Sequence, residues 1–294
     1  MRLWLKVVYP KMGRALNATG RDIWYMMCEW GHANPAEWAA DLALANSWRT
    51  GSDLMPLFPD FMEVAEGNSR WWQYAKPGHY NDPDDVALGF LFGDTGNTST
   101  ALPPTVSEAE AKLYLGTWAM MKACAALPTP DPARFRLTSS GGSPFILSVD
   151  FARNSNKPEG ERNWPSWIVP LVSNRHLISI SQDPLSLQGH RLWSDGVNGS
   201  NANSSAVFVP PGLREVWVGP LAEGEAAMMF VNKAESLSLI NASFALAGPR
   251  FAGCHNVTLF DVLGQRELGW WVSGRIGMSV QPHSAEILRL GCAD

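Results

Sequence analysis

Four carboxylic side chains follow short segments that read as strands, and their type and spacing are suited to acid–base chemistry. Glu29 follows the largely apolar run 22–27, Asp53 follows a second such segment, and Asp82 and Asp84 follow a third. A carboxyl group can give a proton to a reacting atom or take one from it. The carboxyl ends of parallel barrel strands form the rim where barrel enzymes place their chemistry. These residues are therefore candidates for a site at such a rim.

The segments between these carboxylates predict the elements that position them. Ser107 and Glu110 have the spacing of a capping box, which marks a helix start. Apolar runs and turn residues predict strands at 22–27, from 46 and at 144–149, and helices at 35–45 and 108–124. This alternation of strand and helix indicates an α/β domain with parallel strands.

The pattern changes after about residue 206. Short strands separated by Gly, Pro and Asn are expected at 214–218, 226–232, 257–262 and 275–280. Few helical signals accompany them, which is typical of an antiparallel β-sandwich. Polar, breaker-rich loops are expected at 92–106, 152–164 and 194–206. We place the domain boundary in the last of these loops, giving domains 1–195 and 196–294.

The composition favours a globular protein with a large core. The chain has 294 residues, of which 46% are hydrophobic and 17% charged, and its net charge is -5. A nucleic-acid binder normally shows a basic face, so no nucleic-acid partner is expected. No apolar run reaches the roughly 18 residues of a membrane span, so no membrane partner is expected. The 14 tryptophans suit core packing and also stacking on sugar rings.

Cysteines and glycosylation sequons indicate a secretory protein. The four cysteines lack C-x-x-C spacing, so no metal site is expected. We predict a Cys254–Cys292 disulfide, because both residues lie near the ends of candidate strands. Six N-x-[ST] sequons begin at Asn17, Asn97, Asn198, Asn203, Asn241 and Asn256. Lys6 interrupts any signal-peptide-like apolar run at the N-terminus, so we expect the signal to lie outside this chain.

A series of motifs resembles the melibiase-type alpha-galactosidases, glycoside hydrolase family 27. The motifs are M-G-x-A-L-N-x-T-G-R at 12–21, C-E-W-G at 28–31, N-S-W-R-T-x-x-D at 46–53, P-G-H-Y-N-D-P-D at 77–84, I-S-I-S-Q-D-P-L-x-x-Q-G at 178–189 and the segment 283–290. They occur in the order of the family and span nearly the whole chain. The chain is thus similar to the C-terminal portion of such an enzyme.

The resemblance implies a fold and a reaction. The fold would be the C-terminal part of a TIM (β/α)8 barrel, strands 5–8 in residues 1–195, followed by an antiparallel β-sandwich domain in 196–294. The reaction would be retaining hydrolysis of terminal alpha-D-galactosyl residues, with oligosaccharides or glycoconjugates as substrates and no cofactor. Retention requires two carboxyl groups about 5–5.5 Å apart, one a nucleophile and the other a general acid/base.

The resemblance also implies roles for individual residues. Asp53 matches the family's general acid/base. Glu29 and Arg49 match residues at the sugar's 2-hydroxyl, and Asp84 matches a carboxylate that lines the same pocket. Trp30 either stacks on the sugar or supports the strand before Glu29. A carboxylate at position 29 suits a 2-hydroxyl and crowds an acetamido group, so galactose is the expected sugar.

The nucleophile is the main departure. The resemblance places it on the strand before C-E-W-G, upstream of Met1, and residues 1–11 contain no Asp. We therefore expect a chain truncated at its N-terminus and inactive alone. Asp85 and Val86 also replace a Met-Leu-like pair, which would alter the pocket wall.

Alternatives remain at this stage. The chain could be a non-catalytic carbohydrate-binding or scaffold protein derived from the family. An alpha-N-acetylgalactosaminidase and a beta-L-arabinopyranosidase are the other enzymes considered. The complete protein is expected to be secreted, vacuolar or lysosomal. An open half-barrel exposes strand edges, so association, for example as a homodimer, is also expected.

Overall fold

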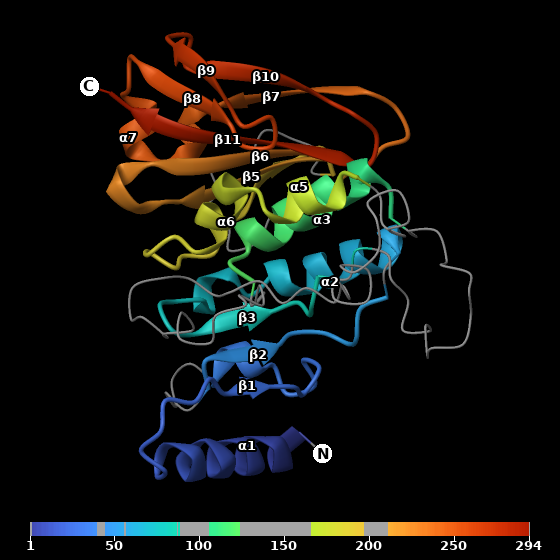
Figure 1. Ribbon diagram of the computed structural model, residues 1–294, viewed down its shortest axis with the longest axis vertical. Helices are drawn as coiled ribbons and strands as arrows, with labels where there is room; N and C mark the ends of the chain where they lie inside the picture. Colours follow the sequence, from blue (N-terminus) through green and yellow to red (C-terminus); the bar gives the residue numbers. More distant parts are fainter. Residues whose placement is uncertain are drawn as a thin grey trace.

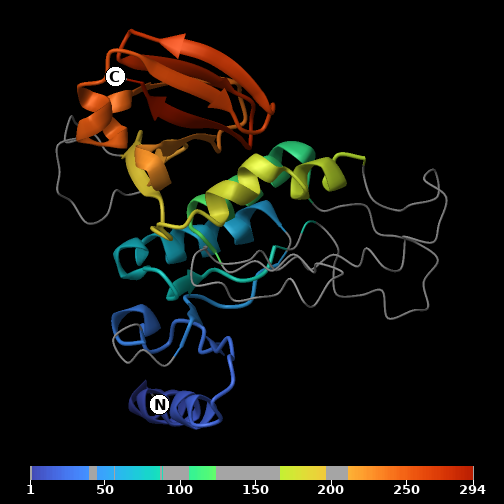
Figure 2. The same cartoon turned by 60° about the vertical axis from the view of Figure 1, so that its left-hand side comes forward.

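The molecule consists of stacked layers. The computed structural model describes residues 2–39, 45–55, 57–86, 88, 106–123, 166–196 and 211–293. Figure 1 shows α1 and a small parallel sheet at one end, helices in the middle and a β-sandwich at the other end. Figure 2, turned by 60°, shows the same order of layers. In the ranges described, no helix combines the length and apolar character needed to cross a membrane.

Three short parallel strands carry the candidate residues at their carboxyl ends. After α1 (Arg2–Asn17), the elements are β1 (Met26–Met27), the 3-10 turn η1 (Pro35–Glu37), β2 (Ser47–Arg49), α2 (Phe58–Ser69), η2 (Trp72–Tyr74) and β3 (Tyr80–Asp82). The order in the sheet is β1-β2-β3, with Met27 opposite Trp48 and Arg49 opposite Asp82. Trp48 is fully buried and its indole N–H donates to Asn81 Oδ1 at 2.8 Å. The sheet is therefore fixed directly below the candidate site.

A helical layer joins the parallel sheet to the sandwich. It comprises α2, α3 (Glu108–Met120), α5 (Ile168–Val172) and α6 (Arg175–Ser181). The capping box predicted for α3 is confirmed, because Ser107 Oγ accepts from the Glu110 N–H and Glu110 Oε2 accepts from the Ser107 N–H. Gly116 of α3 lies against β11, and a Cβ there would come within 2.8 Å of Ile287 Cδ1. A glycine thus allows the helix to approach the sheet closely.

The C-terminal part is an antiparallel sandwich. The strands are β4 (His190–Ser194), β5 (Arg214–Pro220), β6 (Ala226–Asn232), β7 (Ser238–Ser243), β8 (Val257–Asp261), β9 (Arg266–Trp271), β10 (Arg275–Val280) and β11 (Ser284–Cys292), with η5 (Ala222–Gly224), η6 (Phe244–Ala247) and α7 (Pro249–Ala252) between them. Six strands form one sheet in the order β4-β5-β6-β11-β8-β9, and β10 pairs with β7 in the other. Alternate residues of β11 divide two cores: Leu288 faces the interior of the sandwich, whereas Ile287 faces the helical layer.

A buried ion-pair network fastens α2 to the sandwich. Arg191 of β4 contacts Glu66 of α2 at 2.6 Å and Glu215 of β5 at 3.0 Å. Lys233 contacts the same two carboxylates. Because two positive and two negative groups are brought together, each buried charge has an opposite partner.

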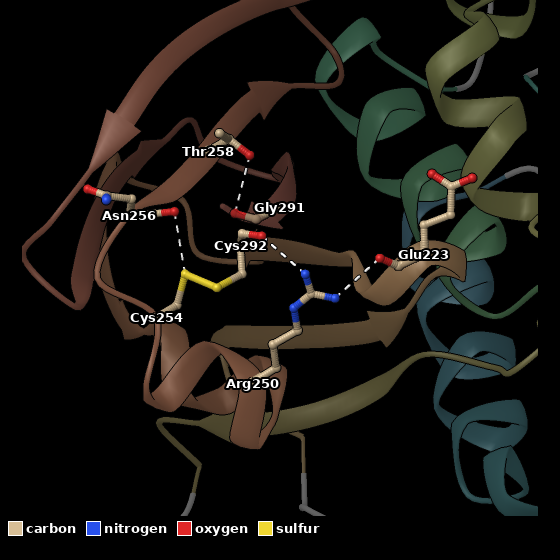
Figure 3. The surroundings of a disulfide bond; sticks show 7 residues. All are labelled: Glu223, Arg250, Cys254, Asn256, Thr258, Gly291 and Cys292. Atoms are coloured by element: carbon tan, nitrogen blue, oxygen red, sulfur yellow. Dashed lines mark hydrogen bonds between the residues drawn. A yellow bond between two sulfur atoms is a disulfide. The ribbon is translucent and has the colours of Figure 1, made fainter. Parts of the chain in front are cut away.

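The predicted disulfide between Cys254 and Cys292 is present, with the two Cα atoms 5.9 Å apart. Figure 3 shows how it holds the segment before β8 to the end of β11. Arg250 of α7 donates to the Cys292 carbonyl oxygen at 3.1 Å and to the Glu223 carbonyl oxygen at 3.3 Å. This corner of the sandwich is therefore tied by covalent and polar links.

Several predicted elements differ in detail from the structure. The first strand is Met26–Met27 rather than 22–27, and the helix expected from residue 35 begins as the 3-10 turn Pro35–Glu37. Left-handed backbone at Asn34 (φ 49°) precedes that turn, so a tight turn replaces the regular helix start. The parallel sheet followed by an antiparallel sandwich is confirmed in outline. The strand predicted at 144–149 and the loops 92–106 and 152–164 lie outside the described residues, apart from Val106.

Candidate functional site

Arg49 is the centre of the site. It ends β2, its residue is only 5% exposed, and its guanidinium contacts two of the predicted carboxylates. Nη1 lies 3.3 Å from Asp53 Oδ1, and Nη2 lies 2.8 Å from Asp84 Oδ2. Nη2 also donates to the Ser52 carbonyl oxygen at 2.7 Å. A guanidinium is a planar set of donors, so this residue fixes the positions of both carboxylates and of the loop between them.

Asp53 and Asp84 differ in their freedom. The Asp53 side chain is 66% exposed, whereas that of Asp84 is 17% exposed. Asp84 Oδ2 also accepts from the Leu54 N–H and its Oδ1 accepts from the Asp85 N–H, both at 2.8 Å. Both carboxylate oxygens of Asp84 are thus engaged in local contacts. Asp53 keeps an oxygen that faces solvent and can exchange protons with a ligand.

The backbone at Asp84 is in an unusual conformation. Its φ is 101°, a value that is strained for a residue with a side chain. The Trp118 indole N–H donates to the Asp84 carbonyl oxygen at 2.8 Å, and the Tyr114 hydroxyl donates to the Asp85 carbonyl oxygen at 2.9 Å. Two aromatic residues of α3 therefore hold the strained loop in place.

Asp82 supports that loop from below. Its residue is 2% exposed and its Oδ1 accepts from the Asp84 N–H at 2.8 Å. Burial raises the pKa of Asp82 to about 7, because removing a carboxylate from water disfavours its charged form. The Asp84 N–H and the charge of Arg49 act in the opposite direction without cancelling this effect. Asp82 is thus a buried bracing residue.

Glu29 lies at the same end of the sheet but points to the other face. It is two residues beyond Met27, and Arg49 is one beyond Trp48, the partner of Met27 in the ladder. Alternation along strands therefore directs these side chains to opposite faces. Glu29 Oε2 accepts from the Ala33 N–H at 2.8 Å, while Oε1 is buried and has no hydrogen-bond partner among the described residues. Burial raises the pKa of Glu29.

Trp30 and Cys28 flank this position. Trp30 is 45% exposed with φ 57°, and its ring lies 6.2 Å from that of His32. Its ring is consequently available at the surface. Cys28 is an exposed free thiol whose pKa is raised by burial, with the charge of Arg49 opposing that shift. The thiol therefore lies on the Arg49 side of the sheet.

Sequence patterns did not identify every residue that shapes the site. Neither Tyr114 nor Trp118 was predicted as a site residue, yet both donate hydrogen bonds to the loop after β3. Their spacing of four residues on α3 was the available signal, because such residues share one helix face. In the described ranges, no three His, Cys, Asp or Glu side chains are grouped to hold a metal ion.

Two protein-family profiles match the chain. Residues 3–124 match the profile described as Alpha galactosidase A, and residues 211–290 match that of the Alpha galactosidase C-terminal beta sandwich domain. The first contains the parallel sheet and the Arg49 site, and the second contains seven sandwich strands, β5 to β11. The fold is that of the family to which these two profiles belong. The chain belongs to the melibiase-type alpha-galactosidases of glycoside hydrolase family 27.

Relatives give the extent of the match. Alpha-galactosidase 2 of Arabidopsis thaliana is 28% identical over 289 residues, covering 96% of this chain and 55% of the relative. Alpha-galactosidase I of Mortierella vinacea superposes with a TM-score of 0.70 at 21% identity, covering 97% of this chain and 62% of that one. A beta-L-arabinopyranosidase of Geobacillus stearothermophilus has a TM-score of 0.68 at 17% identity, covering 100% and 55%. The chain spans about half the length of the curated relatives it matches.

Proposed function

We propose that this chain carries the general acid/base side of a retaining alpha-galactosidase site, with Asp53 as the acid/base. The observation that carries the proposal is Arg49, a buried cation that holds Asp53 and Asp84 at the carboxyl ends of parallel strands. Asp53 protonates the departing glycosidic oxygen and later removes a proton from the attacking water. Its exposed carboxylate allows both transfers.

We propose that the nucleophile comes from the strand before C-E-W-G, as the family resemblance implies, and not from the described carboxylates around Asp53. Asp84 is committed to Arg49 and to two backbone N–H groups. Asp82 is buried, and a carboxyl group with a pKa of about 7 is mostly protonated in acidic conditions, where it is a weak nucleophile. Neither is placed to attack an anomeric carbon. A strand supplied by another part of a complete barrel would bring the required second carboxylate.

Terminal alpha-linked galactose is the proposed substrate group. Glu29 Oε1 and Arg49 Nε are buried and lack hydrogen-bond partners among the described residues. A sugar hydroxyl can donate to the carboxylate oxygen and accept from the guanidinium N–H. Because Glu29 faces away from Arg49 here, the proposal requires its side chain to turn when the barrel is complete. Trp30 offers an exposed ring for the apolar face of the sugar.

The remaining assignments are proposals too. We propose residues 1–195 as barrel strands 5–8 with their helices and 196–294 as the sandwich domain, although β4 precedes that boundary and already pairs with β5. The complete protein is proposed to pass through the secretory pathway. The Cys254–Cys292 disulfide and the exposed sequon residues Asn17, Asn241 and Asn256 support this.

Azide rescue tests the role of Asp53. The chain is fused to the part of the Arabidopsis relative outside the matched region, giving a completed barrel. Asp53→Gly in this fusion should lose roughly 10²-fold or more in kcat/KM with an alkyl galactoside and much less with a dinitrophenyl galactoside. Azide should then attack the glycosyl-enzyme and yield the alpha-galactosyl azide.

The azide product separates the possible roles. A beta-galactosyl azide would show that Asp53 is the nucleophile, because azide would then displace the aryl group directly with inversion. An unimpaired Asp53→Gly fusion would remove its catalytic role. A fusion that folds, binds galactose and hydrolyses no aryl glycoside would favour the non-catalytic binding protein.

A further inference from the structure

Strand β9 presents an uncovered apolar face to solvent. It is the edge strand of the six-stranded sheet, and all six of its residues are exposed. Trp270 is 63% exposed and Val272, just beyond the strand, is 76% exposed. Alternate residues of a strand point to the same side, so Trp270 and Val272 form one surface, the β9 apolar face. Exposed apolar groups on an edge strand promote association unless something covers them.

A glycosylation sequon lies directly beside this face. Asn256-Val257-Thr258 enters the neighbouring strand β8, where Val257 is opposite Trp271 and Thr258 is opposite Trp270. Asn256 comes one residue before Val257, so continuing the same register beyond the Val257–Trp271 pair places it across from Val272. Asn256 and Thr258 therefore belong to the same side of the sheet as the β9 apolar face.

The Asn256 side chain is free to carry a modification. The residue is exposed, so its side-chain amide is accessible from solvent. Figure 3 shows the amide directed away from the Cys254–Cys292 disulfide. Its backbone is held, because the Ala293 N–H donates to the Asn256 carbonyl oxygen at 3.2 Å. A group attached there would leave the surface at a fixed position.

We propose that Asn256 carries an N-linked glycan whose first sugars lie over Trp270 and Val272. In the transfer, Nδ2 of Asn256 forms a bond to C1 of N-acetylglucosamine. The bond from that carbon to the diphosphate of a polyprenyl-linked oligosaccharide breaks, and the amide proton leaves with the diphosphate. The apolar C–H face of a sugar packs well on an indole ring. The proposal rests on secretory passage and is independent of the hydrolase activity.

A glycan fits this face better than strand pairing with a second copy. The β8–β9 ladder is irregular at Leu259 and Phe260, and Gly269 has φ 88°. Arg266 and Glu267 place charges along the same strand. Bulges and charges are the features that keep edge strands from pairing with other chains. The backbone edge is thus protected by its own residues, whereas the side-chain face depends on the glycan.

Oxidative footprinting with mass spectrometry tests the proposal. The 294-residue chain, given a leader, is secreted from a eukaryotic cell, and peptides are analysed for the Asn256 glycan and for oxidation of Trp270. We expect the glycan, and a several-fold rise in Trp270 oxidation in Asn256→Gln. Thr258→Ser, which keeps the sequon, should remain protected, and Thr258→Val should behave like Asn256→Gln. Asn241→Gln removes a sequon on β7 and is the control.

Enzymatic removal of the glycan from the native protein tests the proposal even if the substituted variants do not fold. An endoglycosidase that leaves one N-acetylglucosamine should preserve protection of Trp270. An amidase that removes the whole glycan and leaves aspartate should abolish it. An unmodified Asn256, or Trp270 oxidation that is unchanged by complete removal, overturns the proposal. Concentration-dependent protection of Trp270 in the unglycosylated chain also overturns it, because a second copy would then be the cover.

Discussion

Arg49 and Glu29 each combine contacts that brace the site with a buried polar atom that has no hydrogen-bond partner among the described residues. Arg49 orders the loop that carries Asp53, while Glu29 keeps one buried oxygen without a partner. Unpaired buried polar atoms are rare in folded proteins and commonly mark functional positions. Substituting Glu29 should therefore alter sugar selectivity, whereas substituting Arg49 should alter proton transfer by Asp53.

Glu29 should set the preference for galactose over N-acetylgalactosamine. Glu29→Ser in the completed fusion removes a charge and makes room for an acetamido group. The ratio of kcat/KM for the N-acetylated to the plain aryl glycoside should rise at least tenfold, about 1.4 kcal/mol in differential binding. Parallel kinetics with both substrates provide the measurement. An unmodified fusion that already prefers the N-acetylated substrate contradicts the assignment.

Asp82 should make stability depend on pH. Its folded pKa of about 7 lies above the value of about 3.9 that an aspartate has in an unfolded chain, so the folded state holds a proton more tightly than the unfolded chain. This contribution is complete below about pH 4 and is lost as the pH rises through about 7, on the order of a few kcal/mol. Asp82→Asn should flatten the dependence in denaturant unfolding between these values.

The control for that experiment is Asp22→Asn, which changes an exposed carboxylate. Its unfolding free energy should vary with pH as in the parent chain. If Asp82→Asn retains the full slope, burial of Asp82 is not its source.

At the scale of elements, the disulfide stabilises the sandwich corner. Cys254 and Cys292 are 38 residues apart, and closing a loop of that size restricts the unfolded chain. Replacing both by Ser should lower the free energy of unfolding by about 2–4 kcal/mol. Denaturant titration of the sandwich transition measures this. Cys28→Ser, at an exposed free thiol, should cause little change, and an equal loss there would contradict the assignment.

Local signals identified some elements well. The capping box before α3 is a short-range device, so Ser107 and Glu110 alone determine that helix start. Strands β6 and β10 match the predicted ranges 226–232 and 275–280, because each lies between turn residues. Strands β7 and β9 were not predicted from their patterns. In β7 the buried face consists of Ser238, Ile240 and Ala242, so its apolar alternation is weak, and β9 is exposed throughout.

The site was harder to predict than the strands. The family resemblance implied that Asp53, Arg49 and Asp84 line one pocket, and the structure has Arg49 in contact with both carboxylates. The direction of Glu29 could not be read from spacing, since it depends on how β1 pairs with β2. The strain at Asp84 and the supporting bonds from Tyr114 and Trp118 arise from tertiary packing.

At the scale of the molecule, the layers form a continuous unit. The network of Arg191, Lys233, Glu66 and Glu215 connects α2 with the sandwich. The helical layer also buries a large apolar cluster against the sheet face of β6 and β11. The sandwich therefore positions α2 and α3, which in turn hold the loops that carry Asp53 and Asp84.

The most direct test of the account compares the chain alone with the completed fusion on an aryl alpha-galactoside. Retaining hydrolysis needs a nucleophile as well as an acid/base, and Asp53 cannot serve as both. The purified chain should show no turnover, the fusion should release galactose, and Asp53→Asn should impair the fusion. Robust turnover by the chain alone that disappears in Asp53→Asn would place the nucleophile among these 294 residues and contradict the account.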